Sequence, residues 1–310
     1  MRTAVIDLGT NTFNLLIAEA GIGGGFTTLY NEKLPVKLGE GGINKGIITD
    51  EAFYRGVQAM SYYADMIRQW KGEKILAFAT SAVRNASNGN DFVRTVKEKA
   101  GIDIHVIDGN QEAEYIARGV SQAVKLGKKH SLVMDIGGGS TEFIILNDSE
   151  IFWKQSFEIG ASRLLQRFMP SDPITAAEQK IIADYLIDIL QPLWKAAKDF
   201  NVQELIGASG SFESLAEMVN ARFGSLPGLA EKTECTFDID QCDAIHKQIL
   251  SSTHAERLAM KGLIHMRVDM IVVSAILVET VVSQSGLRRL RYSSYSLKEG
   301  VLREFLDGKI

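Results

Sequence analysis

Two stretches of this chain combine an aspartate, a glycine turn and hydroxyl residues, a set that suits phosphate and metal chemistry. Residues 132–142 read LVMDIGGGSTE, so an apolar run ends at Asp135 and three glycines follow. Glycines lack a Cβ, and their backbone N–H groups can therefore surround an anion closely. A carboxylate beside such a turn repels phosphate unless a cation stands between them, and Mg²⁺ is the usual mediator. We interpret this stretch as a metal-phosphate site.

The same pattern occurs at the start of the chain, where residues 4–17 align with residues 132–145. The matched pairs are Asp7 with Asp135, Gly9 with Gly137, and Thr12 with Ser140. One such turn alone is a weak signal, because Asp and Gly end many strands for ordinary turn reasons. Two copies in register, each between two apolar runs, indicate a duplicated half-domain.

Two further strand ends carry small polar residues. Residues 79–85 (ATSAVRN) place hydroxyls and Arg84 after an apolar run. This suits oxyanion binding, because arginine presents a fork of donors. A capped turn with a solvated arginine is the alternative. Residues 207–211 (GASGS) form another strand-to-helix turn, where helix N-terminal N–H groups can face a ligand.

Charged residues at two predicted helix starts leave alternatives open. Asp108, Glu112 and Glu114 open one helix, and ordinary capping and dipole compensation would explain them. The other interpretation is that Glu112 points across a cleft as a general base. Arg267 and Asp269 begin an otherwise apolar helix, where they either form an internal ion pair or face the cleft.

The apolar runs predict the elements that position these residues, in the order βββαβαβα for each half. The first half has predicted strands at 13–20, 26–30, 75–78 and 104–107, and helices that begin near residues 49, 91 and 108. Residues 21–25 predict a glycine-rich hairpin connection. The second half repeats the order from residue 132. Its predicted strands are 143–146, 151–157, 205–206 and 290–292, and its predicted helices are 175–198, 239–250, 255–261, 268–282 and 297–305.

Composition narrows the class of protein. A chain of 310 residues with 45% hydrophobic and 23% charged residues is typical of a globular protein with two domains. The net charge of −4 argues against a nucleic-acid partner. Cys235 and Cys242 cannot form a disulfide framework, and the apolar segment 270–278 is too short to span a bilayer. We expect a cytoplasmic protein without a membrane partner. The oligomeric state stays open, with a homodimer among the options.

The duplicated halves resemble the clan that includes actin, hexokinase and the heat-shock chaperone ATPases. Within it, the chain is similar to the Ppx/GppA family of exopolyphosphatases and guanosine pentaphosphate phosphohydrolases. The matching segments are AVIDLGTNTFN (4–14), ATSAVRNA (79–86), IDGNQEAEYIARGV (107–120), LVMDIGGGSTE (132–142), GASGSFESLA (207–216), MRVDMIV (266–272) and SLKEGVL (296–302). The resemblance implies an α/β fold of two ribonuclease-H-like domains with the active site in the cleft between them. Domain I is expected at 1–123 and domain II at 124–296, with the closing helix, 297–310, on domain I.

The resemblance also implies roles for individual residues. Glu112 falls on the catalytic glutamate that activates water, and Asp7, Asp135 and Glu142 fall on positions tied to Mg²⁺ or another divalent cation such as Mn²⁺. The implied phosphate-binding residues are Gly9, Thr10, Asn11, Thr12, Arg84, Gly137, Gly138, Gly139, Ser140, Gly207, Ser209, Gly210 and Ser211. Such a set is chemically coherent, because phosphoryl transfer depends mainly on positioning and charge neutralisation.

The implied activity is Mg²⁺-dependent removal of the terminal phosphate of inorganic polyphosphate. The alternative substrate is guanosine pentaphosphate (pppGpp), and less favoured alternatives are an ATP-dependent small-molecule kinase and a non-catalytic phosphate or nucleotide sensor. The chain resembles the short form of the family, which lacks an added helical domain. Three residues depart from the family pattern: Gln111 replaces an acid, and Lys37 and Lys298 replace arginines. The lysines keep the charge but lose bidentate phosphate binding.

Overall fold

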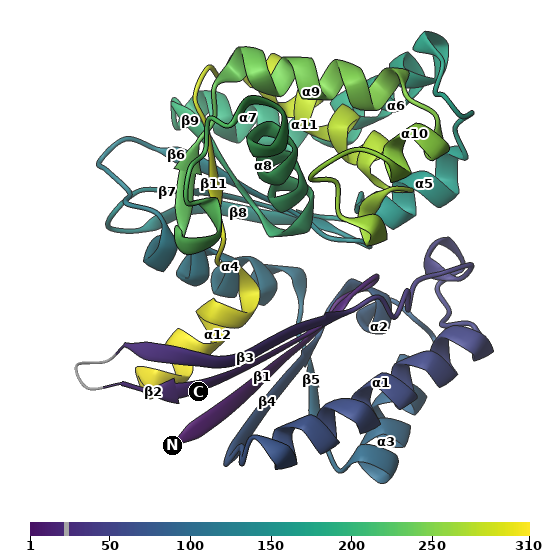
Figure 1. Ribbon diagram of the computed structural model, residues 1–310, viewed down its shortest axis with the longest axis vertical. Coiled ribbons are helices and arrows are strands. Elements are labelled where there is room, and N and C mark those ends of the chain that lie inside the picture. Colours follow the sequence, from purple (N-terminus) through teal and green to yellow (C-terminus); the bar gives the residue numbers. More distant parts are fainter. Residues whose placement is uncertain (22–24) are drawn as a thin grey trace.

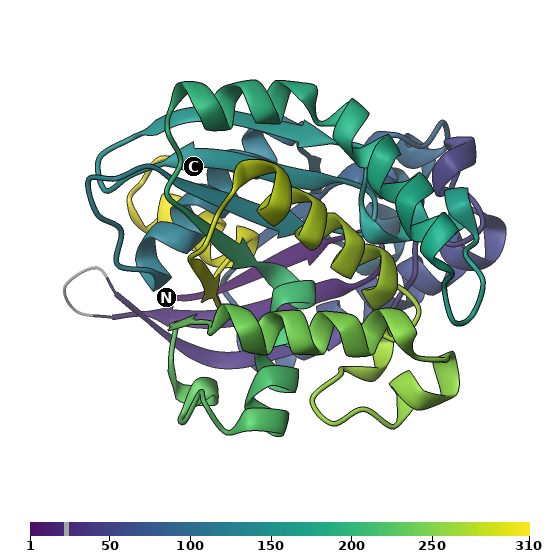
Figure 2. The same cartoon turned by 90° about the horizontal axis from the view of Figure 1, so that it is seen from above.

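The computed structural model describes residues 1–21 and 25–310. It has two lobes, each built on a mixed sheet (Figure 1). The predicted hairpin connection at 21–25 lies partly outside the described residues. Both chain termini lie at the same end of the first lobe (Figures 1 and 2).

The first lobe contains a five-stranded sheet in the order β3-β2-β1-β4-β5. Its strands are β1 (Arg2–Leu8), β2 (Phe13–Ala20), β3 (Phe26–Leu34), β4 (Lys74–Ala79) and β5 (Ile104–Val106). Its helices are η1 (Ile43–Lys45), α1 (Asp50–Gln69), α2 (Ser81–Arg84) and α3 (Gly89–Ala100). Side chains alternate along β1, so Ala4, Ile6 and Leu8 pack with α1 and α3 while Val5 faces the opposite side.

The second lobe contains a six-stranded sheet in the order β10-β11-β9-β6-β7-β8. Its strands are β6 (Ser131–Ile136), β7 (Thr141–Leu146), β8 (Ile151–Phe157), β9 (Glu204–Ala208), β10 (Glu234–Thr236) and β11 (Leu290–Ser293). Its helices are α5 (Ala161–Phe168), α6 (Ala176–Ile189), α7 (Gln191–Asp199), α8 (Ser209–Phe223), η2 (Leu229–Glu231), α9 (Ile239–Ser251), α10 (His254–Leu258), η3 (His265–Arg267) and α11 (Ile271–Ser285).

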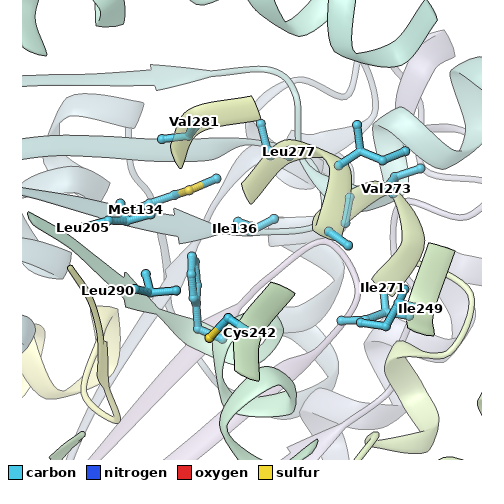
Figure 3. Packing of buried hydrophobic residues seen from close by; sticks show 14 of the residues in the cluster. Met134, Ile136, Leu205, Cys242, Ile249, Ile271, Val273, Leu277, Val281 and Leu290 are labelled. Atoms are coloured by element: carbon cyan, nitrogen blue, oxygen red, sulfur yellow. The ribbon is translucent and has the colours of Figure 1, made fainter. Parts of the chain in front are cut away.

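The outer face of the second sheet carries the largest apolar core of the described residues. From above, α11 lies between α6–α7 on one side and α9 on the other (Figure 2). Met134 and Ile136 of β6 and Leu290 of β11 contribute to this core together with Leu277 of α11 (Figure 3). The strands of this lobe are therefore fixed by apolar packing on the side away from the first lobe.

Two helices, α4 (Gly109–Ala123) and α12 (Leu297–Leu306), lie between the two sheets (Figure 1). Helix α4 contacts β7 and β8, α12 contacts β1 and β2, and the two helices contact each other. Their crossing is very close, since a Cβ added to Gly300 would lie 1.8 Å from the carbonyl oxygen of Tyr115. Only glycine fits there, and this crossing connects the two lobes.

The duplication predicted from the sequence is present in the topology. The order β3-β2-β1-β4-β5 of the first sheet recurs as β8-β7-β6-β9-β11 in the second. The two turns also match, because the N–H of Gly9 donates to the carbonyl of Thr12 over 3.1 Å and that of Gly137 to the carbonyl of Ser140 over 3.0 Å.

Several predicted elements differ from the structure. The single helix predicted at 175–198 is two helices, α6 and α7, with a break at Leu190. Pro192 lies just after the break, and proline cannot donate to the preceding turn. Helix α5 and the short edge strand β10 were not predicted, and α11 begins at Ile271 rather than at residue 268. Among the described residues, no helix is both long and apolar enough to cross a bilayer.

Candidate active site

Both Asp–Gly turns open into one cleft between the lobes, with a volume of about 120 Å³. The turns follow β1 and β6, which occupy equivalent places in the two sheets. Predicted site residues that line the cleft are Asp7, Gly9, Thr10, Asn11, Thr12, Glu112, Asp135, Gly137, Gly138, Gly139, Ser140, Glu142, Ser209 and Gly210. Predicted site residues as far apart in the chain as Asp7 and Gly210, which are 203 positions apart, therefore share one small space.

The carbonyl groups of both turns are engaged by neighbouring backbone. Those of Gly137 and Gly138 accept hydrogen bonds of 2.9 Å from the N–H groups of Ala161 and Ser162, at the start of α5. In the first turn, the carbonyl of Thr10 accepts from Gly39 over 3.0 Å. These bonds fix the turns and occupy carbonyl oxygens that would otherwise repel an anion.

The two turns also touch each other across the cleft. A Cβ on Gly138 would lie 2.5 Å from the side-chain nitrogen of Asn11, and one on Gly139 would lie 2.5 Å from the hydroxyl of Ser81. The Asn11 amide contacts the hydroxyl of Ser162 and the sulfur of Met270. Asn11 therefore lines the cleft as predicted, but its side chain joins the two lobes.

Three acids of the cleft are each held by a neutral donor. Asn14 donates to Asp7 over 2.9 Å, Ser156 donates to Glu142 over 2.7 Å, and the hydroxyl of Ser296 donates to Asp135. In the two sheets, Asp7 is paired with Asn14 and Asp135 with Glu142. Glu142 thus occupies the place that Asn14 has in the first half, so the duplication accounts for its position beside Asp135.

Burial changes the proton affinity of these acids. It raises the pKa of Asp7 to about 6 and, together with the charge of Asp135, raises the pKa of Glu142 to about 8. The pKa of Asp135 is also raised by burial, against the effect of its bond from Ser296. The protein groups around these three acids therefore do not fully stabilise their negative charges.

This donor set fits a hard divalent cation. Carboxylate oxygens are the protein ligands that Mg²⁺ prefers, and Mg²⁺ typically uses one or two of them together with water and substrate phosphate. The part of the chain that the structure describes holds no group of three or more acidic, histidine or cysteine side chains placed to hold a metal ion. Asp7, Asp135 and Glu142 therefore do not form a complete ligand set, and the ion would be held by one or two of them together with water and substrate phosphate.

Glu112 lies at the first turn of α4, and its side chain is buried against Arg84. The guanidinium Nη1 of Arg84 donates to Glu112 over 2.9 Å and to the carbonyl of Ile107 over 3.0 Å. Burial raises the pKa of Glu112 well above its ordinary value, the charge of Glu142 raises it further, and Arg84 opposes both. Helix capping is supplied by Asp108, which accepts from two backbone N–H groups. The acids of this helix start allow two interpretations, as capping residues or, for Glu112, as a general base. Because Asp108 supplies the cap and Glu112 lines the cleft, the structure favours the second interpretation for Glu112.

Three predicted phosphate-binding residues do not line the cleft. Arg84 lies behind Glu112 and is occupied by carboxylates. Gly207 is on β9, where an added Cβ would lie 2.0 Å from the ring of Phe212, so its small size serves packing. Ser211 is buried and donates to Ser274 over 3.2 Å. For these three the predicted direct contact with substrate is not supported by the geometry.

Three cations of the described residues that are not among the predicted phosphate-binding residues line the cleft: Lys33, Arg267 and Lys298. Lys33 is paired with Glu213. Arg267 packs directly on Gly210, and its Nε is buried with no hydrogen-bond partner among the described residues. Asp269 forms ion pairs with His254 and Lys37 instead of with Arg267. Of the two alternatives for Arg267, an internal ion pair or a position facing the cleft, the structure therefore supports the cleft. Lys298 is 13% exposed and lies 3.0 Å from Glu299. The sequence signal for Arg267 was a charge in front of an apolar helix.

The sequence profile of the Ppx/GppA phosphatase family matches residues 16–308. The chain belongs to this family. A crystal structure of an exopolyphosphatase from Cytophaga hutchinsonii is 43% identical, with a TM-score of 0.96, and the match covers 99% of this chain and 98% of that one. Exopolyphosphatase 1 of Mycobacterium tuberculosis is 26% identical over 100% of this chain and 89% of its own length. A Ppx/GppA protein of Aquifex aeolicus shares the fold, with a TM-score of 0.80 at 23% identity.

These matches confirm the predicted family and the predicted fold class of two actin-like α/β lobes. They also confirm the predicted class of activity at its general level, a hydrolase acting on phosphoanhydride bonds. The site residues within the cleft are consistent with that class, since the turns, the cations and the acids are the parts that phosphoryl transfer requires.

Proposed function

We propose that this protein is a divalent-metal-dependent exopolyphosphatase that removes the terminal phosphate of inorganic polyphosphate. One observation carries the proposal: Glu112 lies in the same cleft as both Asp–Gly turns and the cations Arg267 and Lys298. The proposal takes its substrate from the exopolyphosphatase of Cytophaga hutchinsonii, which this chain resembles over nearly its whole length.

In this proposal the chain's own residues perform binding and proton transfer. Backbone N–H groups of the 9–12 and 137–140 turns hold the terminal phosphate, and Arg267 and Lys298 neutralise the phosphate oxygens. Glu112 accepts the proton of the attacking water, and its raised pKa makes its carboxylate a stronger base than an exposed glutamate. A divalent ion held by one or two of the acids Asp7, Asp135 and Glu142 would supply additional charge stabilisation.

An adjacent cavity supports pppGpp as the second candidate substrate. It has a volume of about 270 Å³ and shares Lys33, Glu213 and Lys298 with the cleft. Its walls include Tyr292 and Tyr295, and aromatic rings of this kind stack with nucleobases. A guanosine in this cavity would place its phosphates toward the cleft.

The test is phosphate release from long-chain polyphosphate, pppGpp and ATP in parallel, with Mg²⁺, with Mn²⁺ and with chelator. Metal-dependent release from polyphosphate in preference to the others is expected. Preferential release from pppGpp would favour the second candidate. Release from none of them would refute a phosphohydrolase and leave the kinase and the sensor, which ATP consumption with an acceptor would separate.

We also propose a cytoplasmic location, which suits the two free thiols.

A further inference from the structure

A chain of four alternating charges, Glu112, Arg84, Glu158 and Arg163, runs beside the cleft from Glu112 to the second glycine turn. Arg84 contacts Glu112 through Nη1 at 2.9 Å and Glu158 through Nη2 at 3.5 Å. Glu158 in turn accepts from Arg163 over 2.6 Å. The guanidinium Nε of Arg163 donates to the carbonyl of Gly139 over 2.9 Å. Side chains alone thus join the base to the phosphate turn.

This chain crosses from one lobe to the other at Glu158. Arg84 and Ser81 belong to α2 of the first lobe, and the hydroxyl of Ser81 donates to Glu158 over 2.8 Å. Glu158 and Arg163 belong to the second lobe, between the end of β8 and the first turn of α5. Arg163 also reaches back to the first lobe, where it donates to the carbonyl of Ile43 over 3.0 Å.

The two ends of the Arg84 fork are therefore held by different elements. Nη1 is held by Glu112, at the start of α4 between the two sheets, and by the carbonyl of Ile107. Nη2 is held by Glu158 of the second lobe. Without Glu158 the full charge of Arg84 would fall on Glu112. With Glu158 that charge is divided between two carboxylates, and the plane of the guanidinium is fixed.

We infer that Glu158 is a positioning residue, held by Arg163, that fixes Arg84 against Glu112. This inference rests on the proposed function, because it assigns Glu112 as the base. Glu158 does not line the cleft and its side chain is 44% exposed. It acts on the reaction through Arg84, and it couples the second phosphate turn to the base.

The decisive variant is Glu158→Gln, which removes the charge with little change in size at a partly exposed position. Asp269→Asn is the matched control, since Asp269 also forms an ion pair between the lobes, with Lys37 at 3.9 Å, but does not touch Arg84. We expect Glu158→Gln to lower kcat for polyphosphate at least about tenfold with KM within about twofold, because the base is misplaced rather than the substrate released. Glu158→Asp should restore part of kcat, and Asp269→Asn should leave kcat and KM within about twofold of wild type.

Hydrogen exchange gives a readout independent of activity. The amides of residues 83–85 donate to the carbonyls of Thr80 and Ser81, and they should exchange at least about threefold faster in Glu158→Gln than in Asp269→Asn. Equal losses of kcat in both variants, or an unchanged kcat in Glu158→Gln, would overturn the inference. If the wild type releases no phosphate from polyphosphate or pppGpp, the proposed function fails. In that case unchanged exchange at 83–85 in Glu158→Gln would refute the coupling separately.

Discussion

Replacing Asp7 by Asn should stabilise the metal-free protein at neutral pH, although it removes a residue of the active cleft. Burial raises the pKa of Asp7 from 3.8 to about 6. The difference of roughly two pKa units, at about 1.36 kcal/mol per unit, makes the charged side chain cost about 3 kcal/mol of folding free energy. Asn keeps the size of the side chain and an oxygen that can accept from Asn14, but carries no charge.

The sign of the effect fixes its pH window. The folded pKa lies above the unfolded one, so the stability contributed by neutral Asp7 is fully present below about pH 4 and is lost as the pH rises through about 6. Wild type and Asp7→Asn should therefore unfold alike at pH 4, and the variant should be more stable by up to about 3 kcal/mol at pH 7.5. For domains of 150–250 residues, a gain of about 3 kcal/mol corresponds to a Tm higher by roughly 6 to 12 °C.

The assay is thermal and urea unfolding between pH 4 and 8, in chelator and again in Mg²⁺. The control Asp184→Asn changes an exposed acid on α6. Its free energy of unfolding should stay within about 0.5 kcal/mol of the wild-type value at every pH. Mg²⁺ should raise the stability of wild type more than that of Asp7→Asn, because a bound ion favours the carboxylate. A variant that is less stable than wild type at pH 7.5 in chelator would refute the reasoning about burial.

Two other predictions concern substrate binding and the contact between the lobes. Arg267→Gln removes a cation that packs on Gly210 in the cleft, and should raise KM for polyphosphate about tenfold to a hundredfold, the loss of one charge-assisted bond; a KM within twofold, measured by phosphate release, would contradict this. Gly300→Ala places a methyl group 1.8 Å from the Tyr115 carbonyl, and should lower the free energy of unfolding by about 3 kcal/mol or more in urea. Gly127→Ala, at a position with open space, should stay within about 0.5 kcal/mol, and equal effects of the two substitutions would argue against the close crossing of α4 and α12.

The parts of the site that sequence could predict are local ones. The two Asp–Gly turns follow apolar runs, and each turn is closed by a hydrogen bond between residues three positions apart, Gly9 to Thr12 and Gly137 to Ser140. A repeat of such a unit implies a repeated topology, and the strand orders of the two sheets agree with it. The placement of Glu112 followed from its helix start together with the family resemblance.

What sequence could not predict depends on contacts between distant residues. The side chain of Asn11 is directed by Ser162 and Met270, which are 151 and 259 positions away. Arg84 was expected to bind phosphate, yet its partners are Glu112 and Glu158, since buried carboxylates compete for the same fork of donors. Strand β10 has three residues and lies at the edge of the sheet, where it pairs with β11. Its sequence is too short and too polar to contain the apolar run that identifies a buried strand.

The central claim is that Glu112 acts as the base in the cleft, and Glu112→Gln tests it most directly. Glu114→Gln, two positions further along α4 and 54% exposed beside Lys154, is the matched control. We expect Glu112→Gln to lower kcat for the preferred substrate about 10²- to 10⁴-fold while the variant still binds that substrate, and Glu114→Gln to keep wild-type turnover. Turnover of Glu112→Gln within about twofold of wild type would contradict the assignment of the base.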